Sequence, residues 1–274
     1  MSLPTKSSML WRVEKELTTR CSSSSPRPAA RIVEMYSLFR LPGFLFLLAL
    51  IVSSASACGG GTTPTPALDP NIYRFSASQD ATLYEHAAGE LASSAGTSNF
   101  VGVTNQYEIR RMLLAFDLTS LPANREVINV TLQMRMSKSA SGPFDVAMHR
   151  VTTPWGEGAS SASSNTGGKG STSSAGDPTW VHAVYPDTAW SNSGGDHVAQ
   201  ASAVTRVDNF VRYVWSDPGL VQDVRLWASG EKPNFGWLII GDESNQKTAK
   251  RFDSREHSDL TRRPFLLVEL APIP

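Results

Sequence analysis

The chain has 274 residues, 41% hydrophobic and 18% charged, a composition that fits a globular protein and is too apolar for a disordered one. Its 25 basic and 25 acidic residues balance overall, but residues 1–57 carry seven Lys/Arg against three Asp/Glu, which leaves 18 against 22 from residue 58 onward. A mildly acidic chain lacks the electrostatic footprint of a nucleic-acid binder, so we exclude that partner. The two cysteines, Cys21 and Cys58, precede the expected fold, which excludes a disulfide, a zinc–thiolate site or a cysteine nucleophile within it.

The N-terminal region is predicted to be a targeting segment. Residues 1–34 show no periodic apolar face, and we expect them to be a disordered, non-native extension from a start assigned too early, with translation beginning at Met35. The apolar run Leu41–Val52 is too short to cross a bilayer core of about 30 Å and has the length of a signal-peptide core. Residues 35–57 are therefore predicted to be a signal peptide.

The signal is followed by a candidate lipid anchor. The sequence Ala-Ser-Ala-Cys at residues 55–58 resembles a lipoprotein cleavage site with Cys58 as the lipidated residue, although it also fits ordinary secretory cleavage. Gly, Thr and Pro runs follow, so residues 58–77 are predicted to be an anchor and a flexible linker. We expect an extracellular protein, either an outer-membrane or cell-surface lipoprotein or a secreted one, that touches the membrane only through its lipid.

Residues 78–274 are predicted to form one all-β domain, a β-sandwich or jelly roll. Short apolar runs alternate with Gly, Ser, Asn, Asp and Pro clusters, and Val127–Met136 has the period of two that buries one face of a strand. The candidate strands are Ala81–Tyr84, Phe100–Val103, Arg111–Phe116, Val127–Met136, Phe144–Val151, Val207–Val214, Trp237–Ile240 and Phe265–Leu270.

One short helix and one long loop interrupt this β pattern. Asp217 can cap a helix, Pro218 suits its first turn, and Gly230 can end it, with Leu220, Val221, Val224 and Trp227 on one face. Residues 159–175 are rich in Ser and Gly, lack apolar periodicity, and are predicted to be a long mobile loop.

Catalytic and metal motifs are weak. No Gly-x-Ser-x-Gly elbow is present. Glu157 with Asp187, or Glu243 with Glu256, could serve as paired carboxylates for glycoside cleavage, but nothing places them across a groove. We predict a protein that is not an enzyme and needs no cofactor. Whether a metal is bound stays open: structural calcium could be held by carbonyl oxygens with Asp196 or Asp242.

Ligand-binding candidates fall into two groups. Aromatic side chains stack on sugar rings, and Trp180, Tyr185 and Trp190 lie in a polar loop that could expose them. Acidic glycans would require basic side chains on one sheet face, and the candidates for this role are Arg110, Arg111, Arg135 and Lys138. The alternative for Arg111 and Arg135 is that they serve as ion-pair partners at strand edges.

Six segments in order resemble the DNRLRE-domain family, which is similar to carbohydrate-binding module family 96. They cover Ser78 to Leu270 and are QDATLY (79–84), RRMLLAFDLTSLP (110–122), VTTPWGE (151–157), TWVHAVYPDTAWSNSGGD (179–196), LVQDVRLWASGEKPNFGWLI (220–239) and FDSREHSDLTRRPFLLVEL (252–270). The string that names the family is absent, and the Ser-rich loop after Glu157 looks expanded. The resemblance implies an extracellular β-sandwich, with acidic polysaccharide as the ligand of some members.

We therefore expect a surface-anchored or extracellular, non-catalytic module of the carbohydrate-binding type, with an extracellular glycan, such as an acidic polysaccharide, as its partner. A structural or adhesive surface domain without a sugar site is the main alternative. A polysaccharide lyase or hydrolase is a more remote one.

Overall fold

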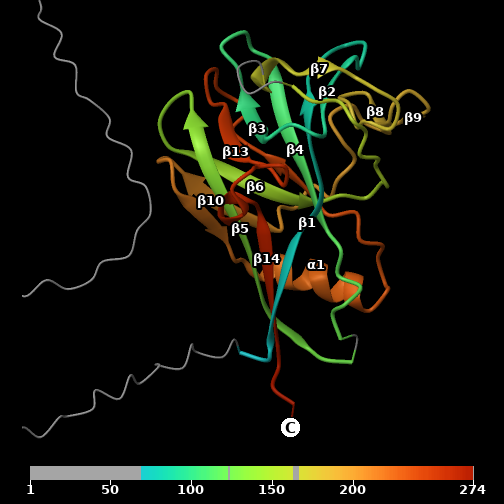
Figure 1. The fold of residues 1–274 in the computed structure, drawn as a ribbon, viewed down its shortest axis with the longest axis vertical. Coiled ribbons are helices and arrows are strands. Elements are labelled where there is room, and N and C mark those ends of the chain that lie inside the picture. The colour runs from blue at the N-terminus through green and yellow to red at the C-terminus, as the bar shows by residue number, and fades with distance from the viewer. Residues whose placement is uncertain (1–68, 123, 163–166, 274) are drawn as a thin grey trace, which may run out of the picture. The chain divides into compact units, whose positions relative to one another are not determined.

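The computed structural model describes residues 69–122, 124–162 and 167–273 (Figure 1). The predicted signal peptide, Cys58 and most of the predicted linker lie outside the described residues. Within these ranges, no helix combines the length and the apolarity needed to cross a membrane.

The described chain is a sandwich of two β layers, which confirms the all-β prediction. Layer one contains β11 (Arg212–Trp215), β5 (Val127–Ser139), β14 (Phe265–Leu270) and the first part of β1 (Ile72–Tyr84). Layer two contains β10 (Ala203–Val207), β6 (Phe144–Arg150), β12 (Trp237–Ile240), β4 (Ile109–Phe116), the rest of β1, β2 (Leu91–Ser93) and β7 (Ser171–Thr172). β3 (Ser98–Val103) and β13 (Lys250–Asp253) connect β4 to β5, and β8 (His182–Val184) pairs with β9 (Thr188–Ala189) as a separate hairpin.

Strand β1 belongs to both layers. Its residues 72–76 pair with β14, and its residues 77–84 pair with β4 after a register shift between Ala77 and Gln79. The strand begins at Ile72, earlier than the domain boundary predicted at residue 78. Tyr73 and Phe75 alternate there with exposed Arg74 and Ser76, so the last residues of the predicted linker already have a strand pattern.

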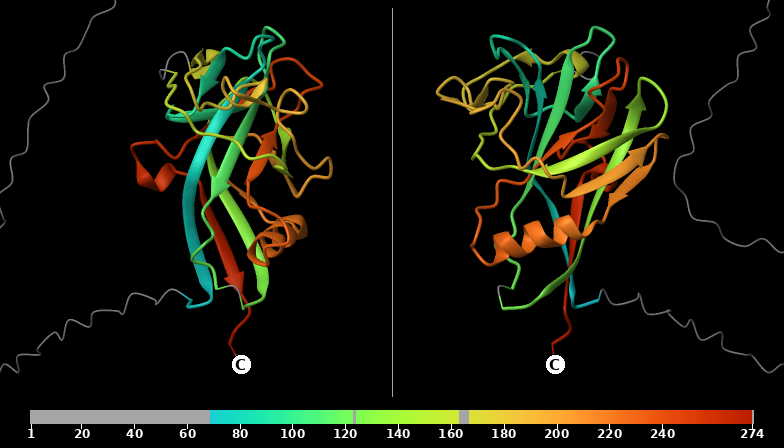
Figure 2. Two further views of the ribbon diagram at one scale, coloured as in Figure 1. Left: turned by 90° about the vertical axis from the view of Figure 1, so that its right-hand side faces the viewer. Right: turned by 180° about the vertical axis from the view of Figure 1, so that it is seen from behind.

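The main core fills the space between the layers. It contains three tryptophans, and the buried Trp215 ring lies edge-on to Phe252, with ring centroids 6.0 Å apart. Helix α1 (Pro218–Ala228) closes one side of this core by packing against β5 and β10 (Figure 2). The ring centroids of its Trp227 and of Trp237 on β12 lie 4.6 Å apart. The predicted helix is thereby confirmed; among described residues the remaining helical segments are the 3-10 turns η1 (Gly167–Lys169) and η2 (Leu260–Arg262).

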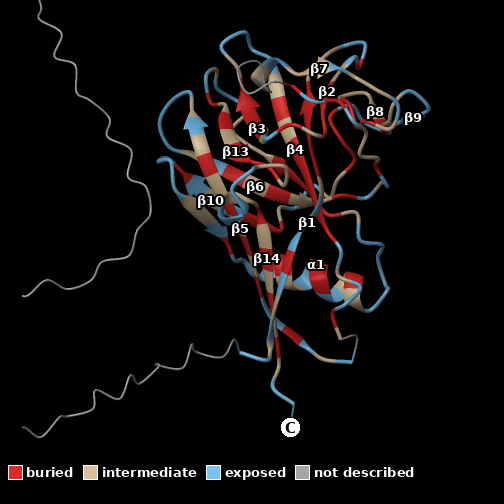
Figure 3. Ribbon diagram, viewed as in Figure 1, coloured by how far each residue is buried: buried red, intermediate tan, exposed pale blue. Residues whose placement is uncertain are grey.

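A second apolar cluster lies on the outer side of layer two, beneath the loops that run from residue 152 to 198. Leu113, Ala115 and Leu238 face these loops and contact Trp155 and Trp190 within the cluster. Layer two is therefore covered on both faces, which explains why Met112 to Phe116 are buried without interruption (Figure 3).

One predicted strand is wrong. Val207–Val214 contains the end of β10, a turn at residues 208–211 and the start of β11. The hydroxyl of Tyr213 fixes this turn by accepting hydrogen bonds from the backbone N–H groups of Asp208 and Asn209, both at 2.7 Å. Asp and Asn are turn formers, and the apolar residues Phe210 and Val211 that suggested a continuous strand are exposed.

The Ser/Gly-rich loop is more ordered than predicted in its described part. Its residues 171–172 form the edge strand β7 on β2. Buried Asp177 accepts hydrogen bonds from the hydroxyl groups of Ser94 and Ser174, at 2.8 and 2.9 Å, and from the backbone N–H of Ser174 at 2.6 Å. The serines therefore attach this segment to the domain instead of leaving it loose.

Candidate functional site

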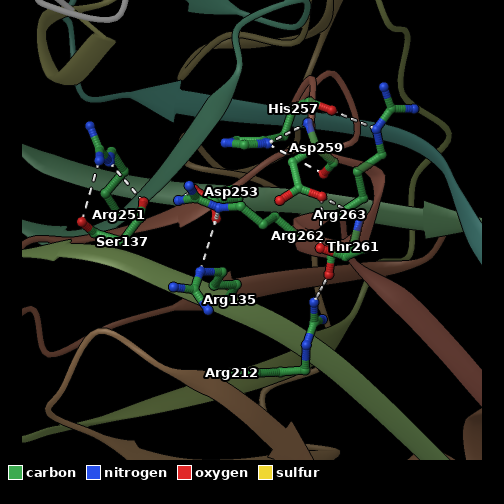
Figure 4. A network of polar contacts seen from close by, with 10 residues as sticks. All are labelled: Arg135, Ser137, Arg212, Arg251, Asp253, His257, Asp259, Thr261, Arg262 and Arg263. Atoms are coloured by element: carbon green, nitrogen blue, oxygen red, sulfur yellow. Dashed lines mark hydrogen bonds and ion pairs between the residues drawn. The ribbon is translucent and has the colours of Figure 1, made fainter. Parts of the chain in front are cut away.

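The outer side of layer one carries a group of basic side chains, which we call the arginine face. Figure 4 shows its members Arg135, Arg212, Arg251, Arg262 and Arg263. The side chains of the whole face come from three strands of the layer, from β13 and from the loop between β13 and β14. The arginine face consists of Arg74 on β1, Arg135 and Lys138 on β5, Arg212 on β11, Arg251 on β13, and Arg262 and Arg263 in the loop.

Two of these arginines stand directly opposite each other. Arg135 and Arg212 are cross-strand partners in the β5–β11 pair, a position where like charges destabilise a sheet. Burial lowers the pKa of Arg212, and the positive charges of Arg135 and Arg74 lower it further. The fold thus holds positive charges together at an electrostatic cost, which a bound anion would relieve.

The ring of Phe265 supports two of the guanidinium groups. The guanidinium carbons of Arg74 and Arg212 lie 4.1 and 5.0 Å from the ring centroid. Stacking on an aromatic ring fixes the plane of a guanidinium and leaves its N–H edge available. Arg212 donates one hydrogen bond to the carbonyl of Thr261, whereas its Nη1 has no partner, and Arg74 donates none within the described chain. Arg74 therefore retains its donors for a ligand, whereas the unpartnered Nη1 of Arg212 is buried.

The acidic side chain at the centre of the arginine face is buried Asp253. Its carboxylate accepts hydrogen bonds from Arg262 at 2.8 and 3.2 Å and forms an ion pair with Arg135 at 3.9 Å. Two neighbouring arginines are held by neutral groups: Arg251 by the hydroxyl of Ser137 at 2.9 Å, and Arg263 by the carbonyl of His257 at 2.7 Å (Figure 4). The positive charge of the face is thus only partly compensated.

A hollow of about 330 Å³ opens at the edge of the arginine face. It combines guanidinium groups with small and apolar side chains, the mixture that sugar-binding clefts require. Its lining residues are Arg74, Ser76, Ala77, Arg255, Leu260, Arg263 and Pro264.

Of the basic residues predicted from the sequence, Arg135 and Lys138 belong to the arginine face, and Arg110 and Arg111 do not. The side chain of Arg110 is 2% exposed and donates to Glu108 and to the carbonyl of Gly168. Arg111 forms a two-pronged ion pair with Glu243, at 2.8 and 2.9 Å. Both therefore have partners within the protein, and both lie on β4 of layer two.

The three predicted aromatic residues lie on the opposite side of the sandwich, in the loops over layer two. Trp190 is buried and its indole N–H donates to the carbonyl of Thr179 at 2.9 Å. Trp180 is half-buried, and the guanidinium carbon of Arg111 lies 5.0 Å from the centroid of its ring. The ring of Tyr185 makes an edge-to-face contact with His182. The structure thus separates these aromatic residues from the arginine face.

Sequence reasoning missed most of the arginine face. Arg74 lay in the predicted linker. Arg212 lay inside the predicted strand Val207–Val214, which in the structure is the end of β10, a turn and the start of β11. The signal available for Arg74 was the alternation at the start of β1, where it follows Tyr73 and precedes Phe75.

The carboxylates named from the sequence are arranged differently from the predicted pairs. Glu157 lies beside Asp80 and Glu256, whereas Glu243 is paired with Arg111. Asp196, a candidate for calcium, accepts backbone hydrogen bonds from Ser191 and Asn192; burial alone would raise its pKa, but these bonds and the Thr153 hydroxyl lower it. Asp242 fixes residues 244–245 in the same manner.

Comparison with models of known protein families gives no match to this chain, and a search of curated proteins gives none either.

Proposed function

We propose that this protein is a non-catalytic module that binds acidic polysaccharide through the arginine face. The observation that carries the proposal is that Arg74 and Arg212 share the Phe265 ring, with Arg135 directly opposite Arg212. Asp253 pairs with Arg135 and Arg262, but Arg212 has no ion-pair partner within the described residues and stands opposite a like charge, an arrangement that reduces the stability of a sheet. A ligand with repeated negative charges supplies that partner.

The chemistry of the arginine face favours carboxylate or sulfate groups on a sugar chain. A guanidinium presents a planar fork of N–H donors that can form two parallel hydrogen bonds to one such anion. The arginines lie on β11, β5 and β1, with β14 between the last two, in a layer whose neighbouring strands are about 4.8 Å apart. An extended chain that crosses these strands can place successive anionic groups against them. The hollow beside Arg74 adds apolar surface for sugar rings through Ala77, Leu260 and Pro264.

The resemblance to the DNRLRE-domain family supports the same ligand class, and the targeting signals support an extracellular location. We propose that Cys58 is lipidated and that the module is displayed on the cell surface. Several acyl chains hold a protein on a membrane more stably than one chain, because each buried methylene contributes about 0.8 kcal/mol.

Replacing Cys58 with Ser is expected to abolish lipid labelling and to release the protein from the membrane fraction. The melting temperature should not change, because Cys58 precedes the first strand, which begins at Ile72. Fractionation of cells that express either form from Met35 would measure this. Wild-type protein found wholly in the medium with unmodified Cys58 would instead establish ordinary secretion.

A glycan array probed with residues 59–274, which contain every described residue, tests the proposed ligand. At about 0.15 M salt we expect retention on uronate-rich or sulfated polysaccharides and none on neutral glucans or mannans. Retention on no glycan would refute the proposal and favour a structural or adhesive domain. Equal retention on DNA would show a general polyanion binder, and release of reducing ends or unsaturated uronides would show a hydrolase or lyase.

A further inference from the structure

Three acidic side chains from distant parts of the sequence meet beside the hollow at the edge of the arginine face. Asp80 belongs to β1, Glu157 follows β6, and Glu256 belongs to the loop between β13 and β14. One carboxylate oxygen from each lies within 4.8 Å of the others. We call these three residues the acidic cluster. Asp80 is completely buried, and the side chains of Glu157 and Glu256 are 12% and 22% exposed.

Two oxygens of the acidic cluster are buried without a hydrogen-bond partner. They are Oδ1 of Asp80 and Oε2 of Glu256, whereas Oδ2 of Asp80 accepts the backbone N–H of Arg255 at 2.8 Å. Buried polar atoms in proteins nearly always have a partner, so two such oxygens in one cluster indicate that a positively charged ligand belongs between them. A bridging water can donate to both oxygens, but only a cation would also offset their negative charge.

The charges of the acidic cluster also leave a place for a divalent cation. The guanidinium of Arg255 binds both oxygens of Glu157, at 2.9 and 2.8 Å, and pairs with Glu256 at 2.9 Å. Three carboxylates and one guanidinium leave a net charge of minus two. The three carboxylates lie close together with this one guanidinium as their partner, so they repel one another when all three are ionised.

We propose that Asp80, Glu157 and Glu256 bind one calcium ion, with Oδ1 of Asp80 and Oε2 of Glu256 among its ligands. The cluster offers oxygen ligands without thiolate or imidazole, which disfavours zinc and copper. Calcium accepts an irregular set of six to eight oxygens, whereas magnesium demands a near-ideal octahedron and retains its waters. The three segments that supply the ligands follow no regular geometry, so calcium fits better.

The side-chain amide of Asn99 can contribute a further ligand. It adjoins Asp80 closely enough to lower the pKa of that carboxyl, which burial raises. Its buried Nδ2 nevertheless makes no hydrogen bond of ordinary geometry, and its Oδ1 accepts a hydrogen bond from Thr82 Oγ1 at 3.0 Å. The two ends of an amide are assigned from their hydrogen bonds. Turning this amide would place its oxygen beside Asp80 and let Nδ2 donate to the hydroxyl of Thr82. With calcium bound in this way, Nδ2 of Asn99 would also have a hydrogen-bond partner.

Calcium titration of chelator-treated protein, residues 59–274, tests the site. Isothermal calorimetry should give one Ca²⁺ per chain, with weaker Mg²⁺ binding. Calcium chloride at about 100 times the Kd should raise the melting temperature by about 5–10 °C, because only the folded chain brings the three acids together. Asp80→Asn keeps the shape of the side chain and removes one charge, and Glu256→Gln does the same at a less buried position. Each should weaken calcium binding at least tenfold.

A control variant separates this site from the loop acids. Asp242→Asn should keep the calcium-induced shift, because Asp242 fixes its own loop and lies outside the acidic cluster. Without calcium, the melting temperature of Asp80→Asn should be no lower than that of wild type, because the substitution relieves repulsion between the carboxylates. Adding calcium should raise the melting temperature of this variant only slightly. Wild-type protein that shows neither heat nor a melting shift with calcium would overturn the proposal, and so would shifts that persist in both Asp80→Asn and Glu256→Gln. Neither result would bear on polysaccharide binding.

Discussion

Replacing Asp223 with Ala is expected to lower the free energy of unfolding by about 3–5 kcal/mol, the usual cost of removing one partner from a buried ion pair. Asp223 on α1 is 6% exposed and pairs with Arg150 of β6 at 3.0 Å. Its other oxygen accepts hydrogen bonds from Ser202 at 2.5 Å and from the indole N–H of Trp237 at 2.9 Å. The substitution therefore leaves one charge and two buried donors unsatisfied where the helix meets layer two.

Urea unfolding followed by tryptophan fluorescence would measure this loss. Gln222→Ala, on the exposed face of the same helix, is the matched control and should change the free energy of unfolding by less than about 0.5 kcal/mol. The loss of unfolding free energy in Asp223→Asn should lie between those of Asp223→Ala and Gln222→Ala. The amide can still accept a hydrogen bond from Trp237 but cannot neutralise Arg150. A loss below about 1 kcal/mol in Asp223→Ala would show that this network does not anchor the helix.

Replacing Arg74 and Arg212 together with Ala is expected to reduce the affinity for an acidic polysaccharide about 100-fold. A hydrogen bond to a charged group contributes about 1.5–3 kcal/mol, and the loss of two such contacts corresponds to at least this factor. The stability of the fold should be unchanged or slightly higher, because the substitutions remove like charges that crowd Arg135. Loss of binding without loss of stability is what separates a ligand-binding role from a structural one.

Calorimetric titration of both forms with an acidic oligosaccharide selected by the array would measure this change. Arg206→Ala with Lys232→Ala removes the same number of positive charges at exposed positions outside the arginine face, and it should retain wild-type affinity. Wild-type affinity should also fall as salt rises, since the contacts are ionic. Equal losses in the two double variants would mean that only net charge matters and would contradict a defined site.

Much of the fold could be predicted from local patterns. The period of two in β5 and the apolar face of α1 depend on neighbouring residues, and both predictions are confirmed. Asp217 does stand at the N-cap position, but its carboxylate accepts the backbone N–H of Val204 and makes no capping hydrogen bond to the helix. β13 was missed because its sequence, KRFD, looks like an exposed segment. Its Lys250 and Asp253 are nevertheless buried: the Lys250 ammonium donates to the hydroxyl of Ser139, and Asp253 accepts from Arg262. Such partners come from elsewhere in the chain and leave no periodic signal.

The arginine face was harder to predict, because its members are scattered from Arg74 to Arg263 and come together only through the pairing of β1, β14, β5 and β11. The net charge from residue 58 onward is negative, and a net charge does not show that positive side chains gather on one face of the fold. Arg111 and Arg135 look alike in the sequence, each on a predicted strand. Only the position of Glu243 shows that the first is neutralised by a close partner.

Hydrogen–deuterium exchange with and without an acidic oligosaccharide tests the central claim most directly, because it locates the ligand on the chain. The account predicts slower exchange in β11 and in the loop at residues 254–264, where Arg212 and Arg263 lie, and no change in the loops at residues 177–196 that carry Trp180 and Tyr185. Protection confined to those loops would place the binding site on the opposite side of the sandwich and contradict the assignment of the arginine face.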